Sequence, residues 1–280
     1  MHSIRELITL SSDFLSKKGV VNPRREAEEL LALLLKKKRL ELYFDYDAPL
    51  EEREVQIYRE WIKRKASKEP LAYILGEVEF LDLKLKVTNE TLIPRHETEI
   101  LADKILNSLP DKPLEIWDVC TGTGCLGLAM KAKRPDCSVA LSDISPKTLE
   151  VTKQNAGQND LDVEILQGDL LEPFEGRKCD VLICNPPYIT ESEYEALEDE
   201  VRLFEPKKAL VGGLEFYKRL ETALPKHLNP YAKVFFEIGA NQKDALDAIF
   251  NQSHWKQKGC EKDWAGHDRF FFLEYHGETK

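Results

Sequence analysis

Strand-like and helix-like stretches alternate from Leu114 onward in this chain of 280 residues. Short apolar runs end at turn residues, and stretches with helical spacing fill the gaps between them. This order predicts an α/β fold, in which a mostly parallel sheet carries helices on both faces. The expected strands are 114–119, 138–143, 163–167, 178–184 and 233–238, and the expected helices are 124–134, 146–158, 214–227 and 241–251. Two closing strands, near Trp255 and at 269–275, have no helical pattern between them and complete seven strands as an antiparallel pair.

The first 70 residues show a different pattern. Apolar residues recur at helical spacing there, as at Ile4, Leu7 and Ile8, which predicts a small helical bundle. Apolar and polar residues then alternate between Val78 and Val87, which predicts a β-hairpin. We therefore expect an N-terminal helical domain at 1–70, a hairpin linker at 71–90 and a larger domain at 91–280.

The charge of the chain is unevenly distributed. Residues 1–75 hold 15 Lys/Arg against 13 Asp/Glu, a net of +2, and the remainder holds 25 against 37, a net of −12. An acidic body argues against a protein whose main task is to grip nucleic acid phosphates. The sequence contains neither a signal-peptide pattern nor an apolar run of the ~18 residues needed to span a bilayer, so we expect a cytoplasmic protein with no membrane partner.

Cysteine and histidine spacing gives no sign of a metal site. The six cysteines contain no CxxC pair, and the six histidines show no ligand spacing such as HExxH. We therefore expect reduced thiols in apolar surroundings and assign no metal.

The segment Asn185-Pro186-Pro187-Tyr188 directly follows a strand-like apolar run. Proline lacks a backbone N–H and fixes φ, so the segment is stiff and poor in donors, and it offers the carbonyl oxygens of Asn185 and its neighbours. Tyr188 adds a flat face beside these acceptors. The arrangement suits a planar NH₂ group whose nitrogen stays open to reaction, although the four residues taken alone fit an ordinary strand-end turn equally well.

Glycines follow the first expected strand of the sheet. The loop Cys120-Thr121-Gly122-Thr123-Gly124 opens a helix, and its glycines allow a tight turn and close approach of a ligand. It is neither a GxGxxG dinucleotide fingerprint nor a P-loop. In a doubly wound sheet, ligands bind outside the carboxyl ends of the strands, where this loop is expected to lie.

Acidic residues follow the next two strands. Asp143 ends the second, where a carboxylate can accept hydrogen bonds from both hydroxyls of a ribose, although it could instead cap the next helix. Asp169 and Leu170 follow the third, where a carboxylate and backbone N–H groups could meet the amino edge of an adenine, although Asp169 could also be a turn residue.

In this order, the four strand-end segments resemble class I S-adenosylmethionine-dependent methyltransferases, in particular the group that carries (N/D)PPY and methylates planar amino groups. Over nearly its whole length, the chain is similar to the release factor glutamine methyltransferase (PrmC/HemK) family. Residues 91–99 (TLIPRHETE) and 201–210 (VRLFEPKKAL), the helical N-terminal domain and the hairpin also carry this resemblance. It implies a Rossmann-like class I methyltransferase fold.

The resemblance also implies an activity. The substrate would be the glutamine of the Gly-Gly-Gln motif in class I peptide chain release factors, methylated on its side-chain amide nitrogen in support of translation termination. The N-terminal bundle is assigned to docking of this protein substrate, with no direct nucleic acid partner. The implied catalytic residues are Asn185, Pro186, Pro187 and Tyr188. The implied residues for S-adenosyl-L-methionine are Cys120, Thr121, Gly122, Thr123, Gly124, Asp143, Asp169, Leu170 and Asn185.

Three positions depart from the family's usual pattern. Cys120 stands where the glycine loop usually begins with Gly, His96 where the family usually has Pro, and Leu170 where an aromatic often flanks the adenine. The first and third bear on how tightly the cofactor packs.

Three other functions compete with this interpretation. One is a methyltransferase that acts on a glutamine of a ribosomal protein. Another is a DNA or RNA adenine amino-group methyltransferase, which would need base flipping and a positive groove and is disfavoured by the acidic body. The third is a non-enzymatic module that binds a release factor or ribosome and merely retains the fold.

Overall fold

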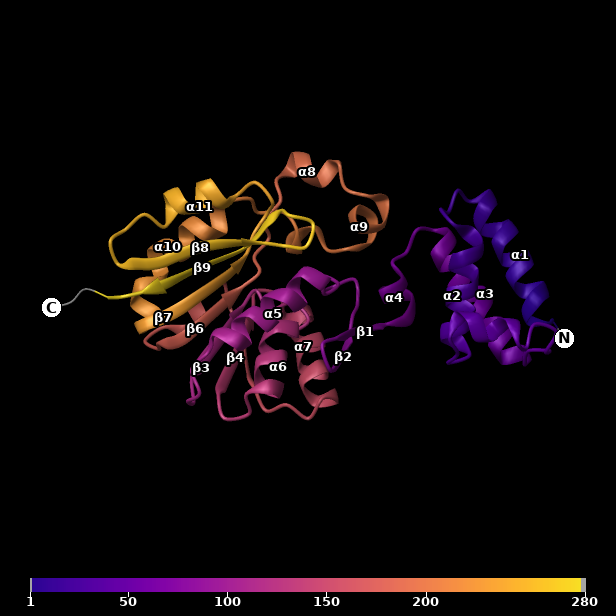
Figure 1. Ribbon diagram of the computed structural model, residues 1–280, viewed down its shortest axis with the longest axis horizontal. Helices are drawn as coiled ribbons and strands as arrows, with labels where there is room; N and C mark the ends of the chain where they lie inside the picture. Colours follow the sequence, from indigo (N-terminus) through magenta and orange to yellow (C-terminus); the bar gives the residue numbers. More distant parts are fainter. Residues whose placement is uncertain (1, 278–280) are drawn as a thin grey trace. The chain divides into compact units, whose positions relative to one another are not determined.

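The computed structural model describes residues 2–277, which divide into two compact units (Figure 1). The smaller unit comprises the chain up to Leu75 together with Asp199–Phe204, and the larger comprises Gly76–Glu198 and the chain from Glu205 onward. We expected the first boundary after residue 70. It lies later because residues 71–75 form a short helix instead of opening the hairpin, and the return of 199–204 to the smaller unit has no sequence signal.

The smaller unit is a helical bundle. Its main helices are α1 (Ile4–Lys17), α2 (Pro23–Leu34) and α3 (Glu52–Ala66), with the shorter η1 (Arg39–Tyr43), α4 (Leu71–Leu75) and α9 (Asp199–Phe204). Leu30 and Tyr58 lie fully buried in its core, where the Tyr58 hydroxyl donates to the carbonyl of Ala27 at 3.0 Å. The helix α9 is held by ion pairs from Lys68 and Lys65.

The larger unit contains the expected mostly parallel seven-stranded sheet, in the order β5-β4-β3-β6-β7-β9-β8. The strand β9 runs antiparallel to both β7 and β8, which confirms the closing antiparallel pair. The strands are β3 (Glu115–Val119), β4 (Ser138–Asp143), β5 (Glu164–Gln167), β6 (Cys179–Cys184), β7 (Leu228–Glu237), β8 (Trp255–Lys262) and β9 (Asp268–Tyr275). The observed β7 begins at Leu228, before the expected residue 233. The sequence pattern missed these first residues because Asn229-Pro230 resembles a turn, although it lies in the strand and pairs irregularly with β6.

Helices cover both faces of the sheet, as predicted (Figure 1). Side chains alternate along a strand, so Ile116 packs on one face and Trp117 on the other. The Ile116 face is covered by α5 (His96–Ser108), α6 (Cys125–Lys133) and α7 (Pro146–Gln158). The Trp117 face is covered by α10 (Glu215–His227) and α11 (Lys243–Ile249).

The predicted hairpin forms a separate two-stranded sheet, β1 (Glu77–Phe80) with β2 (Leu83–Lys86). The side chain of Asn155 on α7 anchors it, because its Oδ1 accepts from the Lys86 N–H at 2.6 Å and its Nδ2 donates to the Lys86 carbonyl at 3.1 Å. Short elements that the sequence pattern did not predict lie in the connections between strands: η2 (Glu172–Phe174), α8 (Glu191–Glu195) and η3 (Lys207–Ala209). Within residues 2–277, no helix combines the length and apolar character of a membrane span.

Two helical glycines provide a matched test of this packing. A Cβ on Gly127 of α6 would lie 2.8 Å from Leu141 Cγ and 3.0 Å from Asp118 Cβ, whereas a Cβ on Gly157 of α7 would meet no atom within 4 Å. We expect Gly127→Ala to destabilise the fold by roughly 1–3 kcal/mol through overpacking. Gly157→Ala should instead stabilise it by roughly 0.4–1 kcal/mol, since alanine restricts the unfolded chain. Urea unfolding of both variants checks this, and equal stability would contradict it.

Candidate active site

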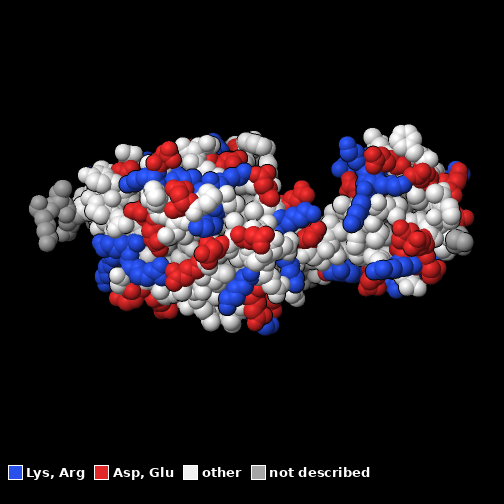
Figure 2. All heavy atoms as spheres, turned by 90° about the horizontal axis from the view of Figure 1, so that it is seen from below, with Lys and Arg blue, Asp and Glu red and all other residues white. Residues whose placement is uncertain are grey.

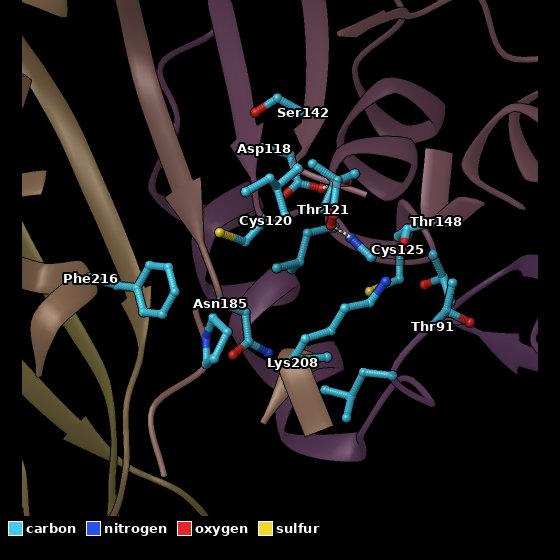
Figure 3. A pocket seen from close by; sticks show the side chains of 18 of the residues that line it. Thr91, Asp118, Cys120, Thr121, Cys125, Ser142, Thr148, Asn185, Lys208 and Phe216 are labelled. Atoms are coloured by element: carbon cyan, nitrogen blue, oxygen red, sulfur yellow. Dashed lines mark hydrogen bonds between the residues drawn. The ribbon is translucent and has the colours of Figure 1, made fainter. Parts of the chain in front are cut away.

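A cavity of about 400 Å³ lies at the carboxyl ends of the sheet strands in the larger unit (Figure 3). Residues from all four strand-end segments singled out in the sequence line it. They are Cys120, Thr121, Gly122, Thr123, Asp143, Asp169, Leu170, Asn185 and Pro187. Of the other predicted site residues, Gly124, Pro186 and Tyr188 lie outside the lining.

Strand register explains why these segments meet. Val119 at the end of β3 pairs with Ser142 of β4 and with Cys184 of β6, so the residues that follow these strands emerge together. The chain proceeds outward from β3 through β4 to β5 and then returns to β6 on the other side of β3. Such a reversal opens a crevice at the strand ends, and here it places the glycine loop beside Asn185.

The two glycines of the loop have different roles. Both have positive φ, 59° at Gly122 and 87° at Gly124. A Cβ at Gly122 would meet nothing within 4 Å, so its backbone faces open space. A Cβ at Gly124 would lie 3.0 Å from atoms of both Leu128 and Thr152, so this glycine serves the packing of α6.

Asp118 holds the glycine loop from beneath. Its side chain is buried, and its Oδ2 accepts hydrogen bonds from Thr121 Oγ1 at 2.5 Å and from the Gly127 N–H at 2.8 Å. Burial raises the pKa of Asp118 to about 6, although these two hydrogen bonds oppose the rise. Asp118 is not among the predicted site residues, although an acid near the end of a buried strand and shortly before a glycine loop is a usable signal.

Asp143 bridges the loop and the next helix. Its Oδ2 accepts from the Gly122 N–H at 3.2 Å and its Oδ1 from the Ser145 N–H at 2.9 Å. The helix α7 is capped by Ser145, whose hydroxyl accepts from the Thr148 N–H, so Asp143 is not needed as the cap. Burial raises the pKa of Asp143, opposed by the two backbone bonds and by the charge of Lys208.

One end of the cavity is lined by residues that follow β5 and by residues of α10. Asp169 forms an ion pair with Arg219 at 2.6 Å, and Phe216 lies on the same helix and on the same cavity wall. Neither α10 residue was predicted, because nothing local in the sequence connects that helix with the end of β5. Leu170, like Cys120, adopts a left-handed backbone, with φ of 52° and 60° respectively. This conformation is uncommon outside glycine and is often found at functional sites. At position 120 it fits the Gly with which the glycine loop of the resembled family usually begins.

The Asn185 amide faces the cavity (Figure 3). Within the described part of the chain it has no hydrogen-bond partner, so its carbonyl oxygen is free to accept. The loop is supported by residues 210–212, since the Ile189 N–H donates to the Leu210 carbonyl and the Ile189 carbonyl accepts from the Gly212 N–H, both at 3.0 Å. A Cβ on Gly212 would lie 2.4 Å from the carbonyl oxygen of Pro187, so only glycine permits this close approach.

Pro186 and Tyr188 do not line the cavity. Pro186 is buried, and the Tyr188 hydroxyl donates to Glu237 at 3.2 Å. Burial raises the pKa of Tyr188, so its hydroxyl remains a donor at neutral pH.

The two other segments that carry the family resemblance meet at Glu205. This buried carboxylate accepts from the Ile93 N–H at 3.1 Å and from Arg95 at 2.5 Å. Arg95 lines the cavity, as does Lys208, which bonds Ser145 at 2.7 Å and approaches Glu90 at 3.7 Å. These rim residues were not among the predicted site residues.

Comparison with solved structures identifies the fold. A methyltransferase from Pyrococcus furiosus superposes with a TM-score of 0.54 at 17% identity, covering 81% of this chain and 100% of that one. A 16S rRNA N2 G1207 methyltransferase of T. thermophilus, solved with AdoMet and guanosine, gives 0.53 at 14% identity and covers 71% and 50% of the two chains. At these identities the likeness concerns the fold alone, which is that of the class I methyltransferases.

Comparison of sequences identifies the family. Residues 6–76 match the PrmC N-terminal domain, and residues 96–209 match the methyltransferase small domain. A release factor glutamine methyltransferase of Chlamydia trachomatis serovar D is 40% identical, over 97% of this chain and 94% of that protein. One of Geobacter sulfurreducens is 35% identical over 95% of each. The chain belongs to the release factor glutamine methyltransferase family.

The raised pKa of Asp118 generates a prediction about stability. Because the pKa is higher in the folded state than the ~3.9 of an unfolded Asp, its contribution to stability is complete below about pH 4 and is lost as pH rises through about 6. Asp118→Asn keeps an oxygen for Thr121 and Gly127 and does not titrate. Between pH 4 and pH 7.5, the wild type should lose on the order of 2–3 kcal/mol of unfolding free energy relative to the variant. Urea unfolding at both pH values measures this, and a pH-independent difference would be inconsistent with it.

Proposed function

We propose that this chain transfers a methyl group from S-adenosyl-L-methionine to the side-chain amide nitrogen of the glutamine in the Gly-Gly-Gln motif of class I peptide chain release factors, in support of translation termination. The observation that carries the proposal is the free Asn185 carbonyl beside a cavity built from the glycine loop, Asp143 and Asp169. Full-length similarity to release factor glutamine methyltransferases supports the choice of substrate.

The residues at the cavity suit the cofactor. Each Asp143 oxygen accepts one backbone N–H and keeps capacity to accept from a ribose hydroxyl. The open space over Gly122 leaves room for close approach of a ligand to the backbone. Asp169 and Leu170 would hold the adenine, and Cys120–Thr123 together with Asn185 would hold the remainder of the cofactor. When bound, S-adenosyl-L-methionine supplies an electrophilic methyl group on a sulfonium.

The chain's own contribution is to hold the acceptor. An amide nitrogen is a poor nucleophile because its lone pair is delocalised into the carbonyl. In our proposal, Asn185 Oδ1 and the Pro186 carbonyl each accept one amide hydrogen, which aims the nitrogen and favours a pyramidal geometry. Ideal alignment of this kind lowers the activation barrier by ~7–11 kcal/mol. Acceptors placed where positive charge develops on the nitrogen lower it further by electrostatic stabilisation.

Two further points complete the proposed mechanism. In our proposal, the ring of Tyr188 packs against the plane of the bound substrate amide. Its hydroxyl is held by Glu237. No dedicated general base is required, because the amide proton can leave after methyl transfer, when the nitrogen is positively charged.

Asn185→Ala tests the proposal. We expect the variant to lose methylation of purified release factor by at least ~10²-fold, a typical cost of removing one preorganised group. Calorimetry should show cofactor affinity within a few fold of wild type. The readout is transfer from labelled cofactor, with mass spectrometry of the Gly-Gly-Gln peptide.

Two controls accompany this measurement. Asn229→Ala removes an asparagine that bonds Asp180 at the opposite end of the sheet and should remain active. A release factor with its glutamine substituted should take no label. Full activity of Asn185→Ala would overturn the mechanism, and labelling of a ribosomal protein but not release factor would reassign the substrate.

We also propose that the protein acts in the cytoplasm, with the release factor and not nucleic acid or membrane as its direct partner. The acidic balance of residues 76–280 supports this. On the face that Figure 2 shows, acidic and basic side chains are interleaved over the larger unit instead of forming a broad basic surface.

The smaller unit offers a surface for docking the release factor. Leu40 and Phe44, on and just after η1, are 69% and 86% exposed. The turn that presents them is fixed, because Arg39 and Tyr43 bond the buried carboxylate of Glu28 at 2.9 and 2.6 Å. Exposed apolar side chains on a rigid support are typical of binding surfaces.

A second exposed aromatic lies near the cavity. Trp264, in the turn between β8 and β9, is 80% exposed and contacts the ring of His96 edge-on, with centroids 4.7 Å apart. His96 directly follows Arg95 of the cavity lining. We propose that Trp264 contacts the release factor around its Gly-Gly-Gln loop, and that His96, where the family usually has Pro, supports the indole.

Substitution of either surface should weaken substrate docking without changing the chemistry. We expect Phe44→Ala and Trp264→Ala each to raise KM for whole release factor by about tenfold with kcat nearly unchanged, since a buried aromatic anchor contributes 1–2 kcal/mol or more. Tyr231→Ala is the matched control: this aromatic is 66% exposed, contacts His276 edge-on and lies near the start of β7. An unchanged KM in both variants would refute these docking sites.

A further inference from the structure

A buried acid, Glu237, contacts the Asn185–Tyr188 loop, and its only part in the proposed mechanism is the bond to the Tyr188 hydroxyl. Glu237 ends β7 and is 1% exposed. Its Oε2 accepts from Thr98 Oγ1 at 2.7 Å and its Oε1 from the Tyr188 hydroxyl at 3.2 Å. Its backbone carbonyl accepts from the Tyr217 hydroxyl at 2.8 Å, so the residue itself is fixed.

Tyr188 is held at two further points. Gln242 Nε2 donates to the Tyr188 carbonyl at 2.7 Å, while Gln242 Oε1 accepts from the Gly239 N–H at 2.9 Å. The guanidinium of Arg269 lies 6.0 Å from the centre of the Tyr188 ring and 3.4 Å from its hydroxyl. The segment Glu237–Gln242 thus contacts both ends of the tyrosine.

Charge compensation makes this arrangement stable in the buried interior. A buried carboxylate is costly unless it is paired and hydrogen-bonded. Glu237 receives two hydroxyl donors and lies near Arg269, which in turn donates to the Ile238 carbonyl at 2.9 Å and pairs with Asp263 at 3.4 Å. Burial raises the pKa of Glu237, and the Thr98 hydroxyl and Arg269 oppose the rise.

We propose that Glu237 and Gln242 are positioning residues for methyl transfer: they fix Tyr188 and, through it, the acceptor geometry of Asn185. This inference rests on the proposed function. The link between Tyr188 and Asn185 is Pro186-Pro187, whose φ angles are fixed. The loop also contacts a second segment, because Gly212 lies close to the Pro187 carbonyl and residues 210–212 pair with Ile189. It is therefore held by two segments, Glu237–Gln242 and residues 210–212, which together form a clamp, and has little freedom to adjust.

Glu237→Gln and Tyr188→Phe test the clamp as a double-mutant cycle in the full chain. Each should lower kcat by roughly ten- to a hundredfold, the cost of a small misplacement of reacting groups. KM for release factor and the dissociation constant for cofactor should stay within about twofold. Because Glu237 acts through the Tyr188 hydroxyl, the double variant should be no slower than the slower single variant. Multiplicative effects on kcat, or full kcat in Glu237→Gln, would overturn the proposal.

Gln242→Glu provides a second, less buried probe. It removes the donor to the Tyr188 carbonyl and keeps an oxygen for Gly239, so kcat should again fall with KM unchanged. Asp180→Asn is the matched control, because this carboxylate also fixes backbone, accepting from the Glu115 N–H at 2.9 Å, but at the far end of β6. It should leave kcat unchanged. Loss of kcat in the control as large as in Gln242→Glu would count against a specific clamp.

Hydrogen exchange separates this inference from the proposed function. In Glu237→Gln and Gln242→Glu, amides of residues 188–190 should exchange at least tenfold faster, while those of the glycine loop stay as in wild type. If the wild type fails to methylate release factor, the proposed function fails, yet the exchange result still decides whether the clamp exists. Unchanged exchange at 188–190 in both variants would overturn it.

Discussion

The pairing of β3 with β6 is the interaction on which the site depends. These strands are parallel neighbours although β4 and β5 intervene in sequence, and the register Val119 with Cys184 brings the glycine loop and Asn185 to the same level. A shift of one residue would turn every side chain of β6 to the opposite face of the sheet. The apolar alternation that buries Leu182 and Cys184 on one face and Val181 and Ile183 on the other therefore also sets the distance between the two halves of the cavity.

Much of this arrangement was predictable because it depends on local sequence patterns. The strands and helices around the sheet follow from apolar runs and helical spacing, and their ends carry the glycines, acids and prolines that line the cavity. The sequence pattern predicted a mostly parallel sheet with helices on both faces but not the order of its strands, since periodicity does not state which strands pair. The extra residues of β7 were missed because Asn229-Pro230 gives a turn signal that the irregular pairing with β6 overrides.

The remaining site residues were not predictable because their function depends on distant partners. Arg219 acquires its role from Asp169, and Glu205 from Ile93 and Arg95, across separations that no local pattern spans. Glu237 ends a strand that looked like ordinary sheet, and Gln242 lies directly before α11, in a stretch that looked like ordinary helix. Tyr188 was the visible residue, while the groups that hold it are elsewhere in the chain.

A common principle connects these residues. Three of the loops around the cavity are each held by a buried carboxylate that accepts two hydrogen bonds: Asp118 for the glycine loop, Glu205 for residues 93–95 and Glu237 for Tyr188 and Thr98. Apolar packing tolerates small shifts, whereas a hydrogen bond loses strength steeply with angle, so such anchors fix a loop in direction as well as in place.

These buried carboxylates also affect how the net charge of the larger unit is interpreted. Part of the −12 of residues 76–280 belongs to carboxylates that are internal and matched to donors, and so it contributes little to the surface field. These buried carboxylates contribute to the net charge because they hold the loops of the cavity in place. The case for a glutamine amide as the acceptor therefore depends mainly on the geometry around Asn185 together with the full-length family likeness, and only secondarily on exclusion of nucleic acid by charge.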